Sequence, residues 1–372
     1  MQVQDILKKD LVGDEWLTVD ELRYLMSVTD EEELQLIYKK AYEVKSHYVQ
    51  PIAYYRGLIE FSNRCIKNCN YCGIRRENDK TERFDMNRED IIKMAQWAYD
   101  HEYGSITLQS GERCDDVFVD YVVDLIRDIK AIGDGSLGIT MCVGEQSEEA
   151  YRRMREAGAS RYLLRIETTN PELYKKIHPH DELHSFDTRV ECLRRLRRVG
   201  FQVGTGVMIG LPGQTEEDLV NDILFYRDMD IDMIGMGPYV VHHDTPLGQE
   251  ALAMGIDTEE GKLKRIQLGL KMIALTRLFL KDVNIAATTA LQALDKLGRE
   301  KGLQAGANIL MPIITIPEHR GKYLLYDNKP CVDDNADKCK DCLTRRVMSI
   351  GDTVGWKQNG DSKHYGKRTG LF

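Results

Sequence analysis

Short apolar runs alternate with longer amphipathic segments from residue 56 onward. Runs that are apolar on both faces are typical of buried parallel strands, and the segments between them, such as residues 87–102 and 215–230, have helical periodicity. Eight such pairs over about 250 residues are what a (β/α)8 barrel of the TIM type needs. A doubly wound open sheet is the alternative, because closure of a sheet cannot be seen in a sequence. The eight predicted strands are residues 56–62, 105–110, 137–143, 161–168, 202–210, 232–239, 284–289 and 307–313.

The two ends of the chain depart from this repeating pattern. Residues 1–50 are predicted to be helical, and both Thr18–Glu21 and Thr29–Glu32 place a hydroxyl and a carboxylate as a capping box does. Residues 316–372 are polar and carry a second group of cysteines. We therefore expect an α/β fold with N-terminal helices (1–50), a barrel (51–315) and a C-terminal cysteine-containing segment (316–372) that packs on the barrel.

Charge and hydropathy narrow the class of protein. The 372 residues include 51 Lys and Arg against 60 Asp and Glu, a net charge of −9. An acidic chain argues against binding of nucleic acid or of anionic membranes. No apolar run approaches the roughly 18 to 20 residues of a membrane span, and the acidic N-terminus resembles neither a secretory signal nor a transit peptide. We expect a cytoplasmic globular protein.

Three of the nine cysteines fall within eight residues, in the loop after the first predicted strand: Cys65, Cys69 and Cys72. In barrels of this kind, chemistry takes place at the C-terminal ends of the strands. A structural zinc site needs four ligands. Three thiolates from one loop can hold three irons of a 4Fe-4S cluster and leave the fourth iron open to a small molecule. The spacing therefore predicts a reactive cluster, with zinc and a distant fourth ligand as the alternative.

The other cysteines divide into a second group and three isolated residues. Cys331, Cys339 and Cys342 have the spacing C-x7-C-x2-C, which favours metal binding over three free thiols. Cys142 and Cys192 are predicted core residues, and Cys114 is given no role. The stretch His242–Asp244 has side chains that can bind metal, but we interpret it as a polar loop or pocket wall.

The C-x3-C-x2-C motif with Tyr71 before its last cysteine resembles the radical SAM enzymes. Further stretches, among them "LQSGE", "RYLLRIETTNPELYKKIHP" and "GVMIGLPGQTEEDL", resemble the HydE family of FeFe-hydrogenase maturases over residues 1–345. Biotin synthase and methylornithine synthase are less similar. The resemblance implies an open iron that chelates the amino and carboxylate groups of S-adenosylmethionine (SAM). One electron from the cluster then cleaves SAM to a 5′-deoxyadenosyl radical.

The resemblance also implies a substrate and partners. The substrate would be a cysteine-bound Fe(CO)2(CN) complex, whose sulfur the radical attacks during assembly of the di-iron centre of hydrogenase. An electron donor of the ferredoxin or flavodoxin type would reduce the cluster, and other hydrogenase maturases would be partners. The second cysteine group would hold an accessory iron–sulfur cluster, 2Fe-2S in type, which the family does not strictly require.

Individual residues take roles from the same resemblance. Arg165 and Glu167 are two apart on a predicted strand, so both point to the same side of it. The alternative for Arg56 and Arg161 is pairing with carboxylates as part of the barrel. The implied SAM-binding residues are Tyr71, Ser110, Gly111, Glu112, Thr140, Arg165, Glu167, Arg189, Met208 and Gly210. The implied substrate residues are Arg56, Arg161, Thr288, Thr289 and Tyr323.

Two other functions stay open from the sequence. One is a radical SAM enzyme acting on an amino acid, as methylornithine synthase does on lysine, or on another thiol. The other is a non-catalytic iron–sulfur scaffold or electron-transfer protein. The implied SAM pocket argues against a scaffold, which has no use for one.

Overall fold

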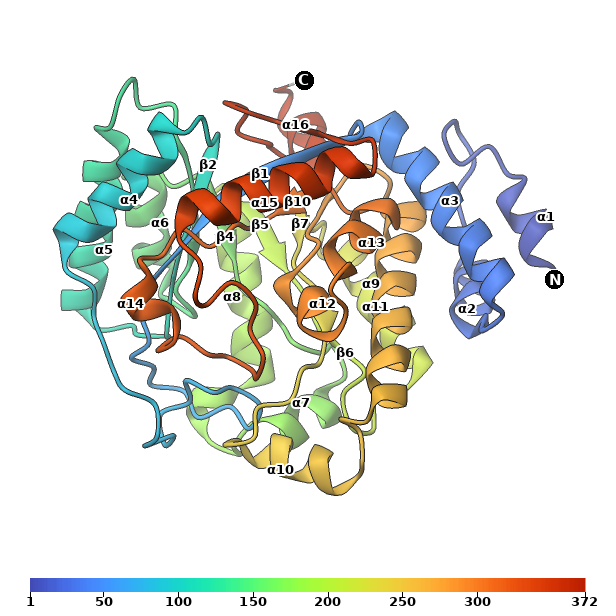
Figure 1. The fold of residues 1–372 in the computed structure, drawn as a ribbon, viewed down its shortest axis with the longest axis horizontal. Coiled ribbons are helices and arrows are strands. Elements are labelled where there is room, and N and C mark those ends of the chain that lie inside the picture. Colours follow the sequence, from blue (N-terminus) through green and yellow to red (C-terminus); the bar gives the residue numbers. More distant parts are fainter. Residues whose placement is uncertain (372) are drawn as a thin grey trace.

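Parallel strands close into a barrel in the computed structural model, which describes residues 1–371 (Figure 1). The first strand lies between the second and the last, and Asn308 N–H donates to the Ile285 carbonyl at 2.9 Å where the ring closes. An Ala286–Ile309 bridge completes that closure. The open-sheet alternative is therefore excluded. Around the ring the strands are β1 (Ile52–Ser62), β2 (Ser105–Ser110), β3 (Gly138–Cys142), β4 (Arg161–Leu163), β5 (Gln202–Thr205), β7 (Met233–Ile234), β9 (Asn284–Ile285) and β10 (Ile309–Leu310).

Helices connect the strands and cover the outside of the barrel. Their apolar faces are buried, and the starts of α4–α11 are capped by side chains; for example, the Asp115 side chain accepts a hydrogen bond from Phe118 N–H at the start of the second connecting helix. The helices are α4 (Arg88–Asp100), α5 (Asp116–Lys130), α6 (Glu148–Glu156), α7 (Pro171–Ile177), α8 (Phe186–Arg198), α9 (Glu216–Asp228), α10 (Pro246–Ala253), α11 (Glu259–Leu280), α12 (Thr289–Leu294) and α13 (Gly298–Gln304), with a 3-10 turn at Glu182–His184.

Two predicted strands are each divided into two shorter ones. The extra pieces, β6 (Met208–Ile209) and β8 (Gly237–Pro238), pair with each other as a separate parallel ribbon. A Cβ atom on Gly206 would lie 2.2 Å from the Gly235 carbonyl oxygen, so the glycine allows the two backbones to approach where the strands break.

The N-terminal residues form α1 (Val3–Leu7), α2 (Val19–Ser27) and α3 (Glu31–Tyr48), and α3 packs against α11. The capping box at Thr18 and Glu21 is present. The second predicted box is wrong: Asp30 is the N-cap and accepts from Glu33 N–H, so α3 starts one residue later than a Thr29 cap would place it.

The C-terminal residues complete the barrel on the outside. Here lie α14 (Pro317–Arg320), α15 (Ala336–Ser349), β11 (Thr353–Val354) and α16 (Lys363–Thr369). Helix α15 crosses in front of β1 and β10 in Figure 1, and Thr344 contacts Tyr55 of β1. It thus takes the place of the eighth barrel helix, while β11 pairs with the N-terminal end of β1. Among the described residues, no helix combines the length and the apolar character that crossing a membrane requires.

Candidate active site

Cys65, Cys69 and Cys72 line a cavity at the C-terminal ends of the barrel strands. Glu112 N–H points at the Cys65 sulfur, 3.3 Å away. Burial raises the pKa of the Cys69 thiol to about 12 and also raises the pKa values of Cys65 and Cys72. Buried thiols become thiolates only when a cation compensates them. Three such sulfurs from a single loop, open to a cavity, fit the donor set of a 4Fe-4S cluster with one free iron.

The turn after β2 is pressed against the cysteine loop. A Cβ atom on Gly111 would lie 2.3 Å from the Arg64 carbonyl oxygen, which only glycine avoids. Gly111 N–H donates to the Ser62 carbonyl at 2.8 Å, and Ile66 N–H donates to the Glu112 carbonyl at 2.9 Å. This packing places the Glu112 carboxylate beside the three cysteines.

Four buried charges lie next to the cysteines and neutralise one another. Lys67 Nζ is 3.1 Å from a Glu112 oxygen and 2.8 Å from a Glu145 oxygen. Arg189 pairs with Glu145 and reaches Glu112 at 3.5 Å. Burial raises the pKa of Glu112, against the pull of Arg189 and Lys67. Because each carboxylate has two cationic neighbours, a zwitterionic amino-acid group can enter and exchange partners without leaving a buried charge unpaired.

Lys67 and Glu145 were not among the predicted site residues. Lys67 lies between two cysteines of the motif, and Glu145 follows β3 at its C-terminal end. Both positions could have been recognised in the sequence, because the catalytic residues of such barrels lie at the C-terminal ends of the strands.

A second ion pair lies on the same cavity, after β4. Arg165 and Glu167 pair at 2.9 Å, in agreement with their predicted common side of the chain. Glu167 has a left-handed φ of 67°, held by its N–H bond to the Gly206 carbonyl. The Thr140 hydroxyl is buried and has no partner among the described residues. These groups offer unused hydrogen-bonding capacity to a polar ligand.

The cavity walls include every predicted SAM-binding residue except one. Tyr71 lies against His178, with its hydroxyl 3.3 Å from the imidazole Nε2, and Met208 lines the cavity nearby. Gly210 does not line the cavity. Its φ of +80° and its N–H bond to the Gln214 side chain shape the turn after β6, and its contact with SAM stays a prediction.

Four of the five predicted substrate residues line the deep part of the same cavity. Arg56 donates to Gly360 O at 3.3 Å and lies 3.0 Å from the Met233 sulfur, but its Nε has no partner among the described residues. Thr288 has an equally unpartnered buried hydroxyl. Thr289 and Tyr323 also line the cavity.

Arg161 is the exception: it does not line this cavity, and it pairs with a carboxylate, which is the alternative left open by the sequence. It is fully buried and pairs with Asp361 at 2.9 Å, and it also donates to the Asn359 carbonyl at 2.6 Å. Residues 359–361 come from the far end of the chain, so this pairing could not be read from the local sequence.

Three further cavity residues were missed by the sequence analysis. Glu60 follows Arg56 and Leu58 along the inward face of β1, so period-two alternation could have found it. Lys329 donates to both Glu60 oxygens, at 2.6 and 2.8 Å, and to the Tyr323 carbonyl. Tyr326 donates to the Thr289 hydroxyl at 2.8 Å. Lys329 and Tyr326 lie in irregular backbone, which carries no periodic signal.

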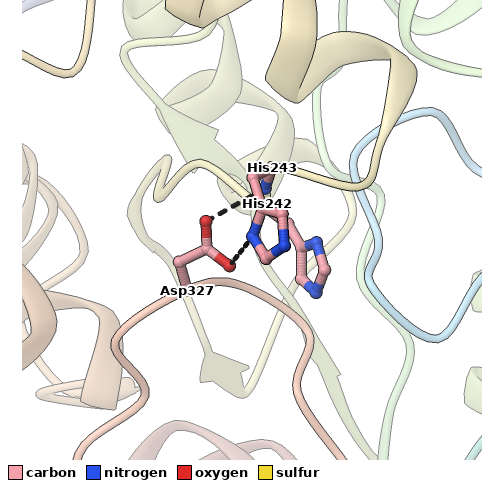
Figure 2. Close-up of side chains that lie close together, drawn as sticks. All are labelled: His242, His243 and Asp327. Atoms are coloured by element: carbon pink, nitrogen blue, oxygen red, sulfur yellow. Dashed lines mark hydrogen bonds and ion pairs between the residues drawn. The ribbon is translucent and has the colours of Figure 1, made fainter. Parts of the chain in front are cut away.

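Figure 2 shows His242, His243 and Asp327, whose potential metal-binding atoms lie within 4.8 Å of one another. His243 contacts Asp327 through its backbone N–H and its ring Nδ1, at 3.0 and 2.9 Å. Asp244 N–H donates to His242 Nδ1 at 3.2 Å. The two contacts between His243 and Asp327 connect the loop after β8 to the C-terminal residues. The group therefore has a structural role as part of a polar loop.

The second cysteine group lies outside the cavity. Cys339 and Cys342 are three residues apart on α15 and so share a helix face, the first buried and the second exposed. Cys331 precedes that helix, and its carbonyl accepts from Arg320 at 2.9 Å. We call Cys331, Cys339 and Cys342 the accessory cysteine site. Of the isolated cysteines, Cys192 is buried as predicted, whereas Cys142 lines the cavity.

Comparisons with known proteins agree with this geometry. Residues 59–226 match the Radical SAM superfamily. The chain is 40% identical to the [FeFe] hydrogenase maturase subunit HydE of Thermotoga maritima over 91% of this chain and 92% of that protein. A crystal structure of methylornithine synthase aligns with a TM-score of 0.78 at 24% identity, covering 94% and 98% of the two chains. The maturase HydG from Carboxydothermus hydrogenoformans aligns with a TM-score of 0.79 at 19% identity, covering 98% and 81%. These two likenesses support the barrel fold alone.

Proposed function

The chain belongs to the HydE family of radical SAM enzymes, and from this premise we propose that it acts in FeFe-hydrogenase maturation on a small cysteine-bound iron complex. The observation that carries the proposal is that the three cysteines and a group of four buried charges lie next to each other on one wall of the cavity. Three cysteines of one loop face the cavity, and a neutral group of four buried charges lies beside them.

The residues present fit a 4Fe-4S cluster and SAM. Cys65, Cys69 and Cys72 would hold the cluster, which together with SAM supplies one-electron cleavage of a carbon–sulfur bond and a carbon-centred radical. Glu112 would accept hydrogen bonds from the methionine ammonium, and Arg189 would pair with the methionine carboxylate. Lys67 and Glu145 then remain as each other's partner, which keeps the buried charges balanced.

Arg165, Glu167 and the apolar side chains of the cavity wall would position the ribose and the adenine of SAM. Glu167 offers carboxylate oxygens to ribose hydroxyls, and its pairing with Arg165 fixes the direction of the side chain. Tyr71 and Met208 provide apolar contact area within the cavity wall. Their role is to orient the reacting atoms and exclude water.

The deep part of the cavity supports an anionic, hydrogen-bonding substrate. Within residues 1–371, Arg56 is a buried cation that pairs with no carboxylate, and the Thr288 hydroxyl has no hydrogen-bond partner. Cyanide and carboxylate groups on a cysteine-bound iron carbonyl complex would satisfy both. We further propose that the accessory cysteine site holds an iron–sulfur cluster. A ferredoxin- or flavodoxin-like donor would supply electrons, and other hydrogenase maturases would be partners.

The test is anaerobic SAM cleavage by the reconstituted and reduced protein, followed by mass spectrometry with and without a cysteine-bound Fe(CO)2(CN) complex. We expect the complex to stimulate turnover and to acquire the adenosyl group. Cleavage to free 5′-deoxyadenosine that is indifferent to the complex, but stimulated by lysine or another thiol, would refute the substrate. No cleavage under any of these conditions would refute the enzyme.

A further inference from the structure

Arg299 is a buried guanidinium with no hydrogen-bond acceptor in the part of the chain that the structure describes. It lies on α13 with 2% of its surface exposed, and its Nε, Nη1 and Nη2 atoms have no partner among the described residues. A buried cation without a partner is costly, so such a residue normally faces an anion. The next residue, Glu300, cannot serve, because both of its carboxylate oxygens bind Arg346 of α15.

Other fully buried arginines show how unusual this is. Arg277 donates to the carbonyls of Gly306, Lys281 and Val283 and to the Asn308 side chain. Arg320 uses three backbone carbonyls, and Arg161 has Asp361. Among the fully buried arginines in the described part of the chain, Arg299 alone has neither a carboxylate nor a carbonyl partner.

Arg299 lies next to the accessory cysteine site. The neighbouring Glu300 pairs with Arg346 of α15. Arg346 comes four residues after Cys342, so it shares the helix face that carries Cys339 and Cys342. The Glu300–Arg346 pair therefore holds the start of α13 against this face, and Figure 1 shows the two helices side by side. At this position the Arg299 charge is close enough to act on Cys331 and Cys339.

The net charge of a cluster at the accessory cysteine site would be opposite to that of Arg299. Three thiolates around a core of two positive charges, whether 2Fe-2S or 4Fe-4S, leave one negative charge. Arg320 gives three of its five N–H donors to carbonyl oxygens, including that of Cys331. None of the guanidinium nitrogens of Arg299 has an acceptor within residues 1–371, so all of its donors are available to such a group.

We propose that Arg299 is the counter-ion of the accessory cysteine site and donates hydrogen bonds to the sulfur atoms of an anionic iron–sulfur cluster held there. This inference rests on the iron–sulfur occupancy proposed above for that site. Hydrogen bonds to cluster sulfurs raise the reduction potential and stabilise the bound cluster. Arg299 is thus a positioning residue for the accessory cluster and has no direct part in SAM cleavage.

The test uses the full chain with Cys69→Ala as background, so that the accessory site dominates the iron signal. Iron and sulfide per chain, the EPR spectrum and the midpoint potential are measured in this background and after adding Arg299→Met or Arg299→Lys. We expect Arg299→Met to lose at least half of the bound iron or to shift the potential to more negative values. Arg299→Lys should recover part of the loss, because it restores the charge.

Two controls keep the result interpretable. Lys338→Met removes an exposed cation next to Cys339 in sequence and should change neither occupancy nor potential. In the chain with Cys69 intact, Arg299→Met should keep the SAM-dependent EPR signal of the first cluster, which reports a folded barrel. Iron content and potential unchanged by Arg299→Met would overturn the counter-ion role. Iron content unchanged by Cys339→Ala would show that the accessory site takes no cluster, and would overturn both proposals for it.

Discussion

At the scale of single residues, the site depends on charges and thiols that are stable only together. Cys65, Cys69 and Cys72 are half-buried thiols that line the cavity, and Glu112 is a buried carboxylate that needs Lys67 and Arg189. Removing one of these charged side chains therefore leaves its neighbours buried without an opposite charge, which is unfavourable. This reasoning gives two predictions with matched controls on the same chain.

Cys69→Ala should abolish SAM cleavage while leaving the fold intact, because two thiolates cannot hold the cluster with a defined open iron. The measurement is 5′-deoxyadenosine production together with a thermal melt. Cys114→Ala is the control, since Cys114 is exposed and should leave cleavage unchanged. Wild-type turnover in the Cys69 variant would refute the cluster assignment.

Arg189→Met should weaken SAM binding at least about tenfold, or about 1.4 kcal/mol, because the methionine carboxylate loses its cation and Glu145 loses a partner. Isothermal titration under anaerobic conditions measures the affinity. Arg194→Met changes an exposed arginine on the same helix and should have no effect. Equal affinities in the two variants would contradict the assigned role.

At the scale of elements, the strands and most of their helices could be predicted from local sequence. A strand buried on both faces appears as an apolar run, and an amphipathic helix appears as a pattern with helical periodicity. Each predicted run overlaps a strand of the barrel. The closure between β9 and β10, the position of α15 as the eighth helix and the Arg161–Asp361 pair could not be predicted. Each of these depends on contacts between residues distant in sequence. The three cysteines were predictable from their spacing, whereas Lys329 was not.

Gly111→Ala should disturb the loop packing that supports the first cluster. The added methyl group would meet the Arg64 carbonyl at 2.3 Å, so the cysteine loop or the turn after β2 has to move. We expect reduced iron incorporation at the first site, measured as iron per chain in a Cys339→Ala background. Gly321→Ala, whose Cβ would meet its nearest neighbour at 3.8 Å, should incorporate iron normally. Full incorporation in the Gly111 variant would contradict this packing argument.

At the scale of the whole molecule, the two ends of the chain hold the barrel that carries the site. Lys45 of α3 and Asp352 form a fully buried ion pair between the N-terminal helices and the C-terminal residues. Gly360 O accepts hydrogen bonds from Arg56 and Asn284 inside the barrel, so the C-terminal residues support the deep end of the cavity.

His364 should make the docking of α16 dependent on pH. Hydrogen bonds to Asp282 and Asp230 raise its pKa above the ordinary value of 6.5. A raised pKa in the folded state means that the stabilisation is present below the unfolded pKa and is lost as pH rises through the folded value. Hydrogen exchange of α16, corrected for intrinsic rates, should therefore show less protection at pH 8 than at pH 6. His364→Gln should remove the difference; a difference that persists in this variant would exclude His364 as its cause.

The central claim is that three cysteines leave one iron free to bind SAM directly. The measurement is electron–nuclear double resonance on the reduced full chain with SAM carrying ¹⁵N in its amino group and ¹⁷O in its carboxylate. The account predicts hyperfine coupling of both nuclei to the cluster, lost in Cys69→Ala. SAM that binds with its usual affinity yet shows no coupling to the cluster would contradict it.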